Sequence, residues 1–254
     1  MTVLAAAGLF VGMLAALEVG RRRAASRLAR DPDSAKDGGG PVEAAIFGLL
    51  GLLLAFTFSG AASRFEGRRH LITDEANAIG TAYLRIDLIP SDAQPAMRDL
   101  FRHYLDLRLE TYRLAKDQPL AMEKYAESVR VQGEIWTAAV AASRREGIPP
   151  SAALLLLPAL NQMIDITTTR LVAVQNHPPS IIYVLLAVLG LLSAVIVGDM
   201  MGRSNARRSF HALIFAATMA VTLYVILDLE YPRLGLIRID SADQTLVDLR
   251  QSMR

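Results

Sequence analysis

The residues whose types and spacing best fit a specific task lie in the second apolar stretch of the chain. At helical spacing, Gly48, Leu52, Phe56 and Ser59 fall on a single stripe. Apolar side chains around a pore can form a constriction that gates by excluding water, and Ser59 and Ser63 would then be its polar lining. The same pattern fits a helix packed in a bundle, with serine hydroxyls bonded to the preceding turn. On the stripe alone, the packed helix is the simpler interpretation.

Charged residues follow this stretch, and the only turn residue among them is Gly67. The pattern therefore predicts one helix that runs from the membrane into the next domain, as a pore helix coupled to a vestibule would. The candidate vestibule charges are Arg64, Arg68, Arg69, Asp74 and Glu75. Arginines facing a vestibule would favour anions and the acidic pair would favour cations, because rings of side-chain charge select the permeant ion. The charges also fit simple interfacial anchors.

Motifs of other chemistry are missing from the sequence. The four histidines are scattered, with none at i, i+4 from another ligand, and there is no cysteine, so no metal site is expected. No phosphate-binding loop, HExxH motif or nucleophile elbow occurs, so we expect neither a cofactor nor an enzyme. The net charge of +2 gives no reason to expect nucleic acid as a partner.

The composition predicts the elements that must position the stripe. Hydrophobic residues make up 52% of the 254 positions and charged residues 20%, which requires the two classes to be segregated along the chain. Four apolar segments are long enough, or nearly so, to cross a bilayer: 3–19, 42–62, 181–198 and 212–227. Arginines follow the first segment instead of preceding it, so we read that segment as a retained anchor and not a signal peptide.

Between the second and third spans the sequence is polar, with helical periodicity and proline or glycine breaks. We therefore expect an all-α polytopic membrane protein with a helical extramembrane domain. Its expected parts are spans one and two (1–63), the helical domain (64–179), spans three and four (180–229) and a tail (230–254). The arginine-rich segments 21–36 and 203–208 place these short loops in the cytoplasm by the positive-inside rule, and the helical domain outside.

Several elements resemble the bestrophin family, and most closely the bacterial proteins with a bestrophin-like domain. They are the apolar span followed by Ser63-Arg64-Phe65-Glu66-Gly67-Arg68, the EANAIGTA stretch at 75–82, Val197-Gly198-Asp199 after the third span, and Asp228-Leu229-Glu230-Tyr231-Pro232 after the fourth. The order of spans and domain also agrees. The resemblance covers about two thirds of the chain and is loose in the central domain.

The resemblance implies a homopentameric channel that passes small inorganic ions. It also implies that the channel lies in a cell membrane, namely the inner membrane of a bacterium. Its neck positions at i, i+4 and i+8 correspond to Gly48, Leu52 and Phe56. Gly48 stands where the family has a bulky apolar residue, so the outermost ring would be wide. The acidic calcium-binding run of the eukaryotic members is missing after Pro232. The family keeps its helical domain and both termini in the cytoplasm, opposite to the charge rule, so the orientation stays open.

A function of another class fits the same composition. The chain could be a non-conducting, membrane-anchored binding or scaffold protein whose helices between residues 92 and 177 engage a partner. The two functions differ in what the second span faces, which is a water-filled axis in a channel and lipid or neighbouring helices in a scaffold.

Overall fold

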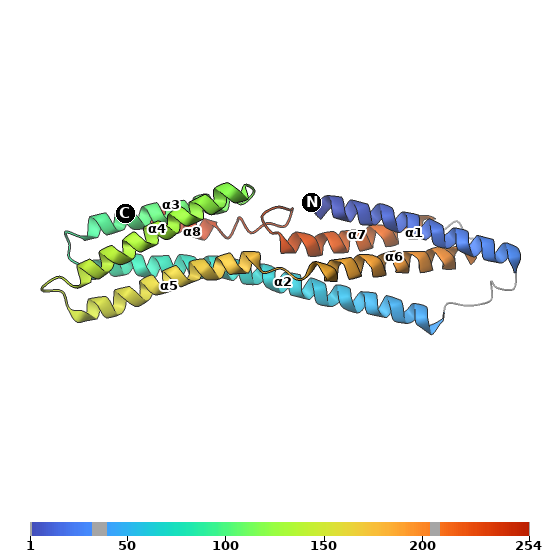
Figure 1. The fold of residues 1–254 in the computed structure, drawn as a ribbon, viewed down its shortest axis with the longest axis horizontal. Coiled ribbons are helices and arrows are strands. Elements are labelled where there is room, and N and C mark those ends of the chain that lie inside the picture. Colours follow the sequence, from blue (N-terminus) through green and yellow to red (C-terminus); the bar gives the residue numbers. More distant parts are fainter. Residues whose placement is uncertain (1, 32–39, 204–208, 254) are drawn as a thin grey trace. The chain divides into compact units, whose positions relative to one another are not determined.

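Every regular element in the structure is a helix (Figure 1). The computed structural model describes residues 2–31, 40–203 and 209–253, and no strand occurs within these ranges. The elements are α1 (Thr2–Arg30), α2 (Pro41–Leu84), the 3₁₀ turn η2 (Arg85–Leu88), α3 (Gln94–Arg113), α4 (Gln118–Ser143), α5 (Pro150–Gln175), α6 (Ser180–Arg203), α7 (Ser209–Glu230) and α8 (Gln244–Ser252). The expected all-α fold is confirmed.

The helices form two compact units. Unit 1 comprises Met1–Ser63 and His177–Tyr231, and unit 2 comprises Arg64–Asn176 and Pro232–Arg254. Helix α2 belongs to both units, because it continues for 44 residues without a break. About 20 residues are enough to cross the hydrocarbon core of a bilayer. The expected continuation of the second span into the extramembrane domain is therefore confirmed.

Unit 1 holds the apolar helices. Within the described residues, four helices are long and apolar enough to cross a membrane, as the sequence predicts. Helices α1, α6 and α7 pack side by side (Figure 1) through Met13, Leu17, Ala194 and Ala216. Small residues allow this close packing between membrane helices, where lipid offers no hydrophobic driving force for association.

Helix α1 is longer than its apolar segment. It continues to Arg30, so much of the arginine-rich segment assigned above to a loop is helical. Glu18 stabilises this continuation by accepting hydrogen bonds from Arg21 at 2.8 Å and Arg22 at 2.7 Å, one turn further along the helix. Residues 32–36 and 204–208 of the two predicted loops lie outside the described residues.

Unit 2 is a bundle of the second half of α2 with α3, α4, α5 and the short α8. Its helices begin and end where proline, glycine or a capping residue interrupts the pattern. Asp117 caps α4 by accepting from the Leu120 backbone N–H at 3.4 Å, and Pro119 occupies the first turn. Gly147 adopts a φ of 84° in the turn before α5, a conformation that favours glycine.

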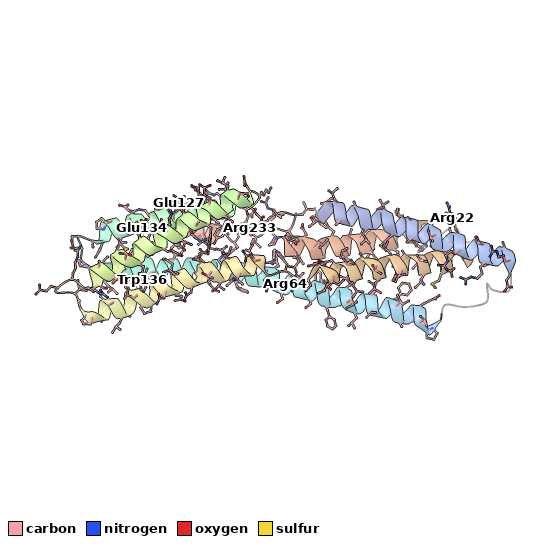
Figure 2. The ribbon with its side chains drawn as sticks, viewed as in Figure 1. Arg22, Arg64, Glu127, Glu134, Trp136 and Arg233 are labelled. Carbon is pink, nitrogen blue, oxygen red and sulfur yellow. The ribbon has the colours of Figure 1, made fainter. Side chains whose placement is uncertain are left out.

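The core of unit 2 is contributed by every one of these helices. Ile72 and Ile79 of α2 pack with Phe101 of α3, Leu160 of α5 and Leu246 of α8, and all five are fully buried. Trp136, the only tryptophan in the sequence, is labelled on α4 in Figure 2 and packs against this core. The unit therefore holds its polar residues against a rigid, well-packed interior.

Candidate functional site

One face of the apolar half of α2 packs within unit 1. Leu50 is buried against Leu186 and Leu189 of α6 and Leu223 of α7, and Leu53 lies beside it. These contacts fix the rotation of α2 about its own axis. They decide which of its residues are left uncovered within the subunit.

The predicted stripe lies on the opposite face. Because an α-helix turns about 100° per residue, Gly48, Leu52 and Phe56 point away from Leu50. Leu52 is 52% exposed and Phe56 is 66% exposed. A methyl group added at Gly48 would meet no other atom within 4 Å, and Ser59 is also exposed.

Ser63 continues the exposed stripe at the end of unit 1. The structure therefore brings all five predicted pore residues to one uncovered face of α2. Thr57, on the packed side, donates its hydroxyl to the Leu53 carbonyl at 2.6 Å, which satisfies that polar group inside the helix.

The five candidate vestibule charges divide into two environments within unit 2. Arg69 and Asp74 are exposed and Arg64 is half-buried, so these three are open to solvent to different degrees. Arg68 and Glu75 are buried. Arg68 donates to the backbone carbonyls of Ala173 and Asn176, at 3.0 and 3.1 Å, and so helps to hold the end of α5 against α2.

Glu75 lies at the centre of a buried charged cluster. Arg108 donates its Nε to Glu75 Oε1 at 2.7 Å, and Arg170 donates an Nη1 hydrogen to Oε2. The Tyr112 hydroxyl donates to the same Oε2 at 2.8 Å and accepts from Arg108 Nη2. Three helices, α2, α3 and α5, are thereby joined through one carboxylate.

The electrostatics of the cluster keep its charges ionised. Burial disfavours the charged guanidinium most strongly, but the attraction and hydrogen bond of Glu75 together with the interactions with Tyr112 and Tyr104 outweigh it and raise the pKa of Arg108 above its usual range. Burial also raises the pKa of the Tyr112 phenol, which therefore stays protonated as a donor. The Arg170 guanidinium lies 4.0 Å from the centre of the Tyr112 ring, a cation–π contact.

Sequence reasoning missed Arg108, Tyr112 and Arg170 as functional residues. A signal was available in α3, where Tyr104, Arg108 and Tyr112 follow one another at four-residue spacing on its buried side. It predicts that an arginine enters the core of the domain, but it does not identify the carboxylate that the arginine meets.

Comparison with known proteins assigns the family. The family model described as the bestrophin-like domain matches residues 3–243 of the sequence. The chain belongs to the bestrophin-like family. A comparison with curated proteins finds no match.

Solved structures of bacterial bestrophin homologues have a fold similar to that of this chain. A crystal structure of a bacterial bestrophin homologue from Klebsiella pneumoniae, carrying one substitution, matches with a TM-score of 0.70 and 13% identity, covering 96% of this chain and 99% of the other. A structure of such a homologue phased with zinc gives 0.69 at 12% identity, covering 95% and 98%. At this identity the likeness concerns the fold.

The bestrophin-like family and fold together support an ion channel in a membrane. Among the residues that the structure describes, no group of three or more acidic or histidine side chains could hold a metal ion. The candidate functional sites that remain are therefore the uncovered face of α2 and the buried charged cluster of unit 2.

Proposed function

We propose that the protein is a homopentameric channel that passes small inorganic ions down their gradient, with α2 of each subunit facing the axis. The observation that carries this proposal is the stripe of Gly48, Leu52, Phe56, Ser59 and Ser63. It lies on the face of α2 opposite its contacts with α6 and α7. A face left uncovered within the subunit is available to line an axis between subunits.

Leu52 and Phe56 form the apolar neck in this proposal. A ring of such side chains offers no hydrogen bonds to permeating water, so it dewets and raises the barrier for hydrated ions. Gly48 contributes a wide ring at the mouth, and Ser59 and Ser63 supply polar lining beyond the neck. Of the five predicted vestibule charges, Arg69 and Asp74 are exposed and would act on ions beyond the serines. We place the channel in a bacterial inner membrane.

The test is ion flux into liposomes containing the purified protein. Phe56→Ala and Leu52→Ala remove the apolar bulk of the neck, so we expect each to raise flux several-fold. Phe58→Ala is the matched control, because Phe58 is also exposed, at 45%, but points about 160° away from Phe56 around the helix. Flux should stay at the unsubstituted level in this control.

The flux of a cation, potassium, and the flux of an anion, chloride, are each measured. If Leu52→Ala and Phe56→Ala leave an existing flux unchanged, the neck assignment is wrong. If all variants and the unsubstituted protein are impermeable to both ions, a non-conducting anchor for the helical domain becomes the better account of the molecule.

A further inference from the structure

Unit 2 contains a cavity of about 520 Å³ between α2, α3, α4 and α5 and the segment that follows α7. Among the described residues that line it, four are arginines and none is acidic: Arg68, Arg108, Arg170 and Arg233. Figure 2 labels Arg233 in the segment between α7 and α8. Small-molecule sites commonly enclose about 300–1,000 Å³, so the volume suits a ligand of modest size.

The charges around the cavity do not balance. Arg233 is neutralised by Asp243, which accepts from its two Nη atoms at 2.7 and 3.0 Å. Arg108 and Arg170, however, share the single carboxylate of Glu75. Two buried guanidinium groups on one carboxylate leave an excess positive charge in a region where an uncompensated charge is costly.

Arg108 also has an unused hydrogen-bond donor. The residue is 1% exposed, and its Nη1 atom has no partner among the described residues. Nearly all buried polar groups in proteins are hydrogen-bonded, so an orphaned nitrogen on a guanidinium whose residue lines a cavity points to a missing acceptor. An anion would supply both the acceptor and the missing negative charge.

The remaining walls determine what kind of anion fits. Leu71, Met122 and Leu171 line the cavity, as does the ring of Tyr125. An inorganic anion would leave these apolar walls without contacts, whereas an apolar body would bury them. We propose that the cavity binds a small organic anion, with a carboxylate head at the Arg108–Arg170 end and an apolar body against these walls.

The experiment measures thermal unfolding of the full-length protein in a non-ionic detergent, followed by Trp136 fluorescence. Trp136 is the only tryptophan and packs against the core of unit 2. The probe is 3-phenylpropionate, and its neutral counterpart is 3-phenylpropionamide at matched ionic strength. A ligand that binds only the folded state raises the unfolding midpoint with its concentration. We expect an upward shift of several degrees with the acid and none with the amide.

Two substitutions that fill the cavity locate the site. Ala115→Phe and Val174→Phe place bulk in it from different segments of the chain and replace no residue of the charged cluster, so each should abolish the shift. Ala126→Phe on the exposed side of α4 lies outside the lining and should keep it. Two variants are used so that one failing to fold leaves the other informative.

Three results would overturn the proposal. They are no shift with the acid at its highest soluble concentration, equal shifts with acid and amide, and a shift that persists in the cavity-filling variants that fold. The cavity lies within unit 2, and the readout is independent of ion flux. A negative result in the binding experiment therefore does not contradict the proposed channel, and a negative result in the flux experiment does not contradict the proposed anion site.

Discussion

At the scale of the residue, the neighbouring carboxylates Asp74 and Glu75 show how strongly position decides role. Asp74 is exposed, whereas Glu75 is fully buried and accepts from Arg108, Arg170 and Tyr112. Removing one partner of a buried ion pair leaves an unpaired charge in the interior, which costs far more than the pair itself contributes. The two side chains therefore make a matched test.

Glu75→Gln should destabilise unit 2 by about 3 to 5 kcal/mol, because it leaves two buried guanidinium groups without a counter-charge. Asp74→Asn removes the same charge one residue earlier and should change the unfolding free energy by less than about 0.5 kcal/mol. Chemical denaturation followed by Trp136 fluorescence compares the two variants. Equal losses of stability would show that the cluster does not hold the unit together.

The difference between these two residues is only partly readable in the sequence. Ile72, Glu75 and Ile79 recur at helical spacing and are all fully buried, so the pattern contained a hint that Glu75 points inward. Its partners come from α3 and α5, far away along the chain, and no local periodicity reports such a contact. The stripe from Gly48 to Ser63 was predictable because its spacing is local.

At the scale of the element, the contact between α1 and α6 depends on glycine. A methyl group added at Gly198 would lie 2.0 Å from the Leu17 carbonyl oxygen, and one at Gly20 would lie 2.0 Å from the Val195 carbonyl oxygen. Backbone atoms cannot yield as a flexible side chain can. The two helices therefore approach each other more closely than any residue with a side chain would permit at these positions.

Gly198→Ala should force α1 and α6 apart and cost about 1 to 3 kcal/mol, the usual range for overpacking. Gly190→Ala on the same helix is the control, since its added methyl group meets nothing within 4 Å. That variant should be as stable as the unsubstituted protein or slightly more so, because alanine favours the helix. The measurement is the fraction of detergent-solubilised protein that stays monodisperse in size-exclusion chromatography after heating. Similar losses in both variants would contradict the close-contact argument.

Helix boundaries were largely predictable, and the exception has a physical reason. Proline and glycine mark most of the boundaries in unit 2, and those breaks are visible in the sequence. The end of α1 was placed too early because hydropathy falls at Arg21, whereas arginine and alanine both favour helix and Glu18 pairs with the next turn. A fall in hydropathy along the sequence marks the end of the membrane-spanning part of a helix, and the helix itself can continue beyond that point.

At the scale of the whole molecule, the proposed channel needs more than one subunit. The stripe on α2 is uncovered within the chain, and a single exposed face encloses no pore. Five subunits arranged around a rotation axis would bring five copies of Leu52 into one ring and five copies of Phe56 into the next, one helical turn away. The number of subunits is therefore the quantity on which the channel most directly depends.

We expect native mass spectrometry of the protein, purified in mild detergent, to give five subunits. A chain of 27.6 kDa gives a pentamer well separated in mass from neighbouring assemblies. Because the sequence lacks cysteine, Ser59→Cys also provides a single thiol whose cross-linking between subunits can be read without background. Because one thiol per subunit can join only two subunits, cross-linking should stop at dimers, and their formation would place Ser59 of neighbouring subunits close together near the axis. A monomer or dimer that persists across detergents, with no cross-linking at residue 59, would leave α2 no axis to line and would favour a membrane-anchored scaffold instead.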